Sequence, residues 1–154
     1  MRKGEKWIFK SLRAYSKGIP IIPKLYCTLV RIVFACDFNY TTKIHPSVEF
    51  IHNGLGCVIH PKAMIAEGCK IYQNVTLGGN GKVVNGEAVN RGGPVLEKNV
   101  TVFSGACVLG PVTIGENSII GANAVVIKDV PSNSIAVGVP AVIKPKTNDY
   151  NFQN

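Results

Sequence analysis

The sequence predicts a parallel β-helix, a solenoid of short strands wound in coils, because it carries a six-residue repeat with small residues at a fixed offset. Aliphatic residues occupy every sixth position in two unbroken series, which are Ile59, Ile65, Ile71 and Leu77, and then Leu96, Val102, Val108, Ile114, Ile120 and Val126. A period of six fits neither a helix nor a simple strand, whose periods are about 3.6 and 2 residues. Such repeats indicate coils that stack the same residue class in layers.

The second observation is a small or short-branched residue four positions after most of these aliphatic residues. These small residues are Ala63, Cys69, Val75, Val100, Ala106, Val112, Ser118, Ala124 and Val130. We expect each aliphatic side chain to fill the coil interior and each small partner to lie where the chain turns a corner. Turn conformations that other residues avoid are expected at Gly68, Gly105, Gly110, Gly115 and Gly121. A β-sandwich is the alternative, but it has no reason to keep a six-residue phase.

The chain of 154 residues is one domain by length, and its 46% hydrophobic content is enough for a core. Residues 5–17 and 24–35 have helical spacing of apolar residues, so we expect residues 1–36 to form a helical cap on the open end of the solenoid. Residues 37–144 are expected to form the solenoid, with the polar, Gly-rich stretch 80–95 protruding as a loop. Residues 145–154 are expected to be a mobile tail. The predicted class is therefore all-β with a short helical cap.

The net charge of +8 is concentrated near the N-terminus, where residues 1–50 hold nine Lys or Arg against three acidic residues. Solubility explains such an excess, and weak association of a basic amphipathic helix pair with a membrane surface is the alternative. Nucleic-acid binding is not expected, because basic and aromatic residues are not interleaved. Prolines and basic residues interrupt the longest apolar stretch, 19–35, so it is too broken to span a bilayer. Five cysteines without CxxC spacing, and no secretion signal, predict a reducing cytoplasmic location.

His52 is the candidate general base. It lies in the segment FIHNGLGCVI, where Gly54 and Gly56 let the backbone bend closely around the imidazole. A histidine can take a proton from a hydroxyl near neutral pH, and it needs an acidic partner to fix its tautomer. Asp37 lies fifteen residues earlier, an offset that can bring two side chains close on adjacent coils of roughly eighteen residues. His45 and His60 each precede a proline and are interpreted as surface-turn residues.

Four segments, together with the break in the six-residue step, resemble the serine O-acetyltransferase branch of the hexapeptide acyltransferases. The segments are TLGGNGK (76–82), SGACVLG (104–110), IGANAVVIKDVP (120–131) and GVPA (138–141). The resemblance covers about residues 37–144. It implies a left-handed β-helix, a homotrimer with active sites in grooves between neighbouring coils, and acetyl transfer from acetyl-CoA to a hydroxyl. It also implies that His52 is the base and Asp37 its orienting partner, with no metal.

The same resemblance implies positions for the cofactor. CoA would lie along a groove lined by small residues, which are Ser104, Gly105, Ala106, Gly121 and Ala122. Lys128 and Lys144 would attract the nucleotide phosphates, although a solvated surface role suits both lysines equally. A backbone N–H at Gly79 is expected to stabilise the oxyanion of the tetrahedral intermediate. Arg91 and Asn53 are the candidate acceptor-binding residues.

The chain departs from the family pattern where the acceptor would bind. Ile51 replaces the acidic residue that usually precedes the histidine, the usual loop Arg-His-Pro reads Arg91-Gly92-Gly93-Pro94, HNGLG carries one extra residue, and the N-terminal region is short. L-serine is the default acceptor, and a sugar hydroxyl on a glycan precursor is the alternative. A non-catalytic scaffold subunit and a metalloenzyme of the γ-carbonic anhydrase type, using the three histidines, are alternatives from other classes.

Overall fold

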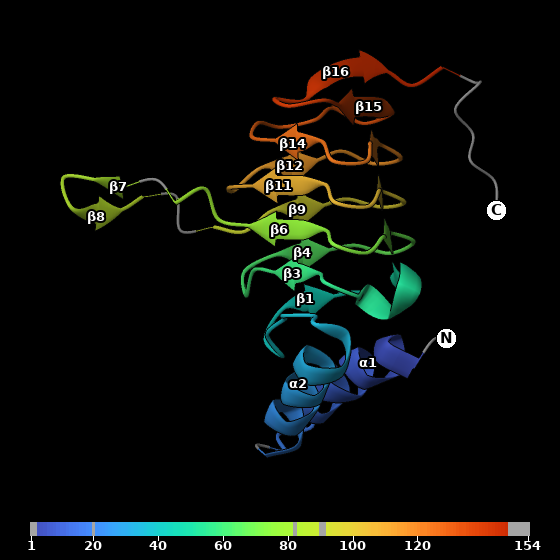
Figure 1. Cartoon of the computed structure of the whole chain (residues 1–154), viewed down its shortest axis with the longest axis vertical. Helices are drawn as coiled ribbons and strands as arrows, with labels where there is room; N and C mark the ends of the chain where they lie inside the picture. The colour runs from blue at the N-terminus through green and yellow to red at the C-terminus, as the bar shows by residue number, and fades with distance from the viewer. Residues whose placement is uncertain (1–2, 20, 82, 90–91, 148–154) are drawn as a thin grey trace.

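The computed structural model describes residues 3–19, 21–81, 83–89 and 92–147. They form a column of stacked coils that stands on two helices, with the C-terminal strands at the far end of the column (Figure 1). The helices are α1 (Lys3–Ser16) and α2 (Ile21–Phe34). "All-β" therefore describes the column alone. Helix α2 begins three residues earlier than expected, because Pro23 lies in the first turn, where the missing N–H has no helical partner to lose.

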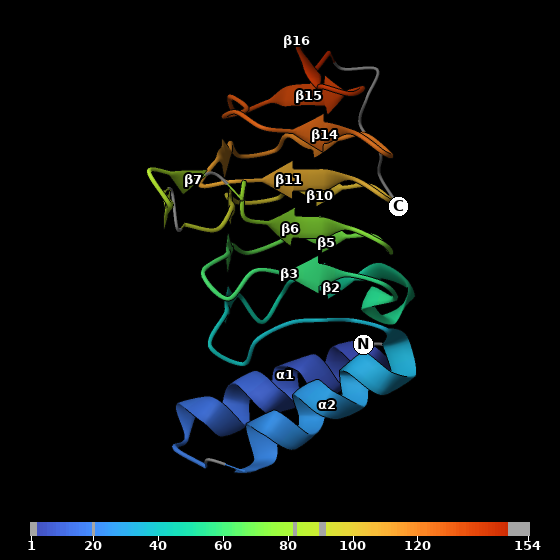
Figure 2. The same ribbon diagram turned by 60° about the vertical axis from the view of Figure 1, so that its left-hand side comes forward.

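Three sheets of short strands make the walls of the column (Figure 2). The first sheet contains β1 (Lys43–Ile44), β4 (Met64–Ile65), β9 (Val95–Leu96) and β12 (Thr113–Ile114). The second contains β2 (Glu49–Phe50), β5 (Lys70–Ile71), β10 (Thr101–Val102), β13 (Ile119–Ile120), β15 (Ser134–Val137) and β16 (Val142–Pro145). The third contains β3 (Val58–Ile59), β6 (Thr76–Gly78), β11 (Cys107–Leu109) and β14 (Val125–Val126). All strand pairs within these three sheets are parallel except β15 with β16.

The column is filled by the six-residue aliphatic ladder. All ten aliphatic residues of the two series are at most 3% exposed. They stack in register, for example Leu77 with Val108 and Val108 with Val126. The nine small residues are buried too, at most 7% exposed. The predicted interior is therefore confirmed.

The corners use asparagine as well as glycine. Gly105 has a φ of 71°, and a Cβ there would lie 2.1 Å from Oδ1 of Asn123, which occupies the next corner with a φ of 56°. Asparagine tolerates this left-handed region better than most residues with a side chain. Two expected turn glycines are different: Gly115 and Gly121 do not have a positive φ. They are needed for space, since a Cβ on Gly121 would lie 2.7 Å from Cγ1 of Val137.

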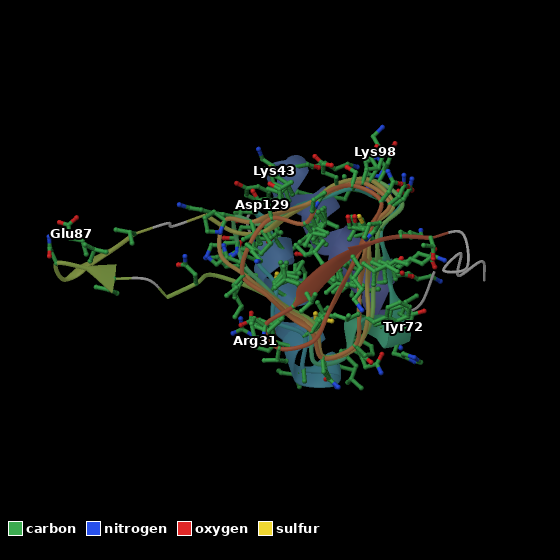
Figure 3. All side chains as sticks on the ribbon, turned by 90° about the horizontal axis from the view of Figure 1, so that it is seen from above. Arg31, Lys43, Tyr72, Glu87, Lys98 and Asp129 are labelled. Carbon is green, nitrogen blue, oxygen red and sulfur yellow. The ribbon has the colours of Figure 1, made fainter. Side chains whose placement is uncertain are left out.

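The segment between β6 and β9 leaves the column as an arm (Figures 1 and 3). Its described part contains the antiparallel pair β7 (Val83–Val84) and β8 (Glu87–Ala88). Asn85 and Gly86 connect these strands with φ angles of 51° and 79°. Two consecutive positive φ angles at Asn-Gly are typical of a type I′ hairpin turn.

Removing one layer of the ladder is expected to destabilise the column strongly. Leu77→Ala should lower the free energy of unfolding by about 2–5 kcal/mol, because it empties a fully buried site between two stacked coils. Val142→Ala, at a residue that is 58% exposed, should change it by at most about 0.5 kcal/mol. Urea unfolding followed by circular dichroism measures both. Equal effects of the two substitutions would contradict the assigned core.

Because of its buried thiols, the column should become less stable as the pH rises into the alkaline range. Burial raises the pKa of Cys57 and of Cys69 from 9.0 to about 11. Above pH 9 the unfolded chain therefore loses thiol protons that the folded chain keeps until about pH 11. The free energy of unfolding should fall across this window by up to about 1.4 kcal/mol per pH unit for each thiol. Urea unfolding at several pH values should show a shallower fall for Cys57→Ala/Cys69→Ala, whereas parallel slopes would contradict the assignment.

Candidate functional site

His52 lies on a short turn in a coil that is longer than the regular coils of the column. Val58 pairs with Thr76, eighteen residues later, and Thr101 pairs with Ile119, also eighteen residues later. The pairing of Glu49 with Lys70 crosses the His52 segment and is 21 residues long. The added length forms the 3₁₀ turn η1 (Ile51–Gly54) between β2 and β3. His52 is therefore held outside the wall, and its side chain is exposed.

The backbone at His52 is strained. His52 has φ 55° and ψ 38°, and Asn53 has φ 63° and ψ 16°. Among the described non-glycine residues with positive φ, only His52 and Ala35 are not asparagine. Such a conformation costs on the order of 1–3 kcal/mol and persists only where its surroundings impose it. Backbone strain at an exposed titratable side chain is a common mark of a functional residue.

Helix α1 is one of the elements that impose this conformation. The backbone N–H of Gly4 donates to Oδ1 of Asn53 at 3.1 Å, and the backbone N–H of Phe50 donates to Oε1 of Glu5 at 2.8 Å. Glu5 is 3% exposed and Phe50 is fully buried. Gly4 itself has no room for a side chain, since a Cβ would lie 2.5 Å from the backbone oxygen of Asn53. The first turn of α1 thus packs directly on η1.

Asp37 lies beside β3, where the preceding coil would place a strand of the third sheet. Its backbone N–H donates to the carbonyl of Cys57 at 2.8 Å, and it forms a parallel bridge with Val58. Its carboxylate accepts a hydrogen bond from the guanidinium of Arg31 in α2, as part of an exposed ion pair. Within the described part of the chain, no hydrogen bond joins Asp37 to His52. The proposed dyad therefore remains a prediction, and hydrogen bonds of this kind are often long before substrate binds.

Stacked corners bring His52 to the same edge of the column as most of the residues predicted to line the CoA groove. The backbone N–H of Asn74 donates to Leu55, that of Gly105 to Gln73, and that of Asn123 to Ser104, at 2.8, 3.1 and 2.9 Å. We call this the His52 edge, and it comprises residues 51–56, 72–74, 103–105 and 121–123. Ser104, Gly105, Gly121 and Ala122 belong to it. Ala106 follows the corner with its side chain fully buried, so only its backbone could contact a ligand.

The remaining predicted residues lie elsewhere. Gly79 and Lys128 lie where the chain passes from the third sheet to the first, which is a different edge. Gly79 faces the ring of His60 there, since a Cβ on Gly79 would lie 3.9 Å from Nε2. Lys144 lies on β16, exposed at the far end of the second sheet. Arg91 is outside the described residues. Figure 3 looks down the column, and the labelled residues Tyr72, Lys98 and Asp129 mark its different edges.

The thiols beside His52 are poor nucleophiles at neutral pH. Burial raises the pKa of Cys36, next to Asp37, and that of Cys57, just after η1. Both side chains stay protonated near pH 7, which disfavours a covalent acyl-cysteine intermediate. No group of three or more His, Cys, Asp or Glu side chains among the described residues is arranged to hold a metal ion.

The sequence did not predict the side-chain contacts of Arg31 and Glu5 that help to hold this site to the helices. From the sequence alone, Arg31 and Glu5 contribute only charge to the N-terminal region, yet in the structure Arg31 binds Asp37 and Glu5 binds the strand before His52. A weak signal existed for Glu5, because it is the lone acidic residue in a helix that is otherwise basic.

Comparison with known proteins agrees with the hexapeptide-repeat fold. Residues 93–128 match the family described as bacterial transferase hexapeptide (six repeats). The serine acetyltransferase of Synechococcus elongatus is 40% identical over 82% of this chain and 49% of its own length. That of Bacillus pumilus is 35% identical over 96% of this chain and 68% of its own length. The chain spans about half the length of the first of these relatives.

Solved structures show the same likeness. A serine acetyltransferase in complex with CoA matches with a TM-score of 0.77 and 26% identity, over 92% of this chain and 56% of that one. The serine acetyltransferase of Neisseria gonorrhoeae in complex with serine matches with a TM-score of 0.77 and 28% identity, over 90% of this chain and 54% of that one. These matches imply that the β-helix is left-handed. The chain belongs to the serine acetyltransferase family of hexapeptide-repeat transferases.

Proposed function

We propose that this protein transfers an acetyl group from acetyl-CoA to the hydroxyl of L-serine, with His52 as the general base. The observation that carries the proposal is the strained, exposed His52 at the base of a stacked edge whose two upper corners include small residues. The likeness to a serine acetyltransferase in complex with CoA supports the donor, and the likeness to one in complex with serine supports the acceptor.

The His52 edge suits an extended thioester arm. Its corners carry Ser104, Gly105, Gly121 and Ala122, whose small side chains let a ligand approach the backbone. Successive coils are about 4.8 Å apart, so the Ser104 corner lies about 10 Å along the column from the His52 corner. An arm lying along this edge would present its thioester to the imidazole and keep its nucleotide further up the column.

The chemistry then needs only one proton carrier. His52 takes the proton of the serine hydroxyl as the oxygen attacks the thioester carbonyl. The tetrahedral oxyanion is stabilised by positioned backbone N–H groups, among which we place that of Gly79. The C–S bond breaks as the intermediate collapses, and the imidazolium returns its proton to the CoA sulfur. O-acetylserine and CoA leave, and His52 is again neutral. Asp37 orients the imidazole throughout.

This arrangement requires more than one copy of the chain. Gly79 and Lys128 lie on a different edge from His52, so one subunit cannot bring them to the same thioester. A homotrimer that places this second edge of one subunit against the His52 edge of the next would complete the site. Lys128 and Lys144 would then be available to the CoA phosphates.

A sugar hydroxyl is the second candidate acceptor. It is favoured by Ile51, which precedes His52 where the family has an acidic residue. An apolar side chain there cannot pair with the ammonium group of an amino acid. CoA release measured with L-serine and with a panel of sugars separates the two acceptors.

The role of His52 is testable without disturbing its turn. His52→Asn should lower kcat/KM by about 10²–10⁴-fold, because asparagine cannot act as the base. Asparagine suits the positive φ, as it does at five other described corners. His45→Asn is the matched control, since its ring hydrogen-bonds to Ser47 on an exposed turn. Loss of thioester absorbance reports the rate, and a His52→Asn enzyme as active as the control would refute the proposal.

The packing of α1 on η1 is expected to set the position of the base. Gly4→Ala introduces a methyl group 2.5 Å from the backbone oxygen of Asn53, so the turn or the helix must shift. A displacement of about 1 Å can cost on the order of 100-fold in rate, and we expect kcat to fall by 10-fold or more while KM for acetyl-CoA changes little. Ser16→Ala, at the exposed end of the same helix, is the control. Equal kcat values for the two variants would show that α1 does not position His52.

A further inference from the structure

The helix pair carries two long stripes of exposed side chains with different chemistry. On α1, Lys6, Lys10 and Arg13 are exposed, and Lys17 is exposed in the turn directly after the helix. The spacing of four and three residues places the three helical residues on one face of α1. On α2, Ile21, Leu25 and Ile32 likewise share one face, and they are 77%, 55% and 74% exposed. Ile22 and Val33 widen this apolar stripe.

The two stripes adjoin one another. The helices pack side by side beneath the coils (Figure 2), with the hydroxyl of Ser11 donating to the carbonyl of Pro23 at 3.0 Å. Nζ of Lys10 lies 5.9 Å from the centre of the Tyr26 ring, and Tyr26 follows Leu25. On its other side the apolar stripe is bordered by Lys24, which is also exposed. Cationic side chains therefore flank the apolar stripe on both sides.

The apolar stripe is not buried within the described chain. The opposite face of α2 contributes Pro23 and Val30 to the buried interior. Exposed branched and aliphatic side chains in a continuous stripe are unusual unless another surface covers them. The charged side chains beside the apolar stripe indicate which kind of surface covers it.

We propose that this helical surface docks on an anionic lipid bilayer, with the apolar stripe at the acyl boundary and the basic stripe at the headgroups. Residues 3–34 carry seven Lys or Arg and one acidic residue, Glu5, which is buried against Phe50. This positive charge repels a second copy of the same surface and attracts anionic headgroups. No described helix is long and apolar enough to cross a membrane. The proposal is independent of the acetyl acceptor.

Vesicle sedimentation of the full chain tests the docking surface. Wild-type protein should pellet with vesicles of phosphatidylcholine and phosphatidylglycerol in equal amounts, and much less with phosphatidylcholine alone. Lys6→Gln/Lys10→Gln should weaken this binding by about fivefold for each charge removed. Ile21→Gln/Leu25→Gln/Ile32→Gln should weaken it at least about tenfold. Val142→Gln is the control, an equally apolar exposed residue at the other end of the column.

Three results would overturn the proposal. Wild-type protein could fail to pellet with the anionic vesicles at low salt, or it could pellet equally with neutral ones. The triple glutamine variant could keep its vesicle binding while light scattering shows a smaller assembly than the wild type. That last outcome would assign the stripe to contacts between copies of the chain. Unchanged circular dichroism of each variant ensures that a loss of binding is not a loss of fold.

Discussion

The register of the stacked coils is the constraint on which the rest of the structure depends. Aliphatic side chains six residues apart fill the interior, and each layer fits only if every coil returns to the same phase. A regular coil achieves this in eighteen residues, whereas the coil with His52 contains 21. The added residues cannot enter the filled interior, so they leave the wall as η1 and carry His52 outward. The exposure of His52 is a consequence of packing.

The helix pair links this turn to the outer surface of the protein. Helix α1 contacts η1 through Gly4 and the preceding strand β2 through Glu5. Arg31 of α2 pairs with Asp37, so both members of the proposed dyad are attached to the helices. A force on the helices, such as docking on a surface, would thus reach the site through these three contacts.

The sequence predicted the column well because each part of the ladder is a local property. The six-residue repeat identifies which side chain of each strand is buried. His52 can be recognised because it lies where this repeat is interrupted. The partners of the site were harder to predict, because they depend on contacts between distant segments. Glu5 and Phe50 are 45 residues apart. The corners were only partly predicted, since asparagine and glycine share the left-handed region and glycine also serves where space is short, as at Gly121.

The most direct test is a crystal structure with CoA and L-serine bound. The quantity to measure is the distance from the imidazole of His52 to the serine hydroxyl oxygen. We predict a distance of about 2.6–3.2 Å, with the CoA arm lying along the His52 edge towards Gly121. Serine seated away from His52, or an imidazole sealed beneath a neighbouring subunit with no path to the thioester, would contradict it.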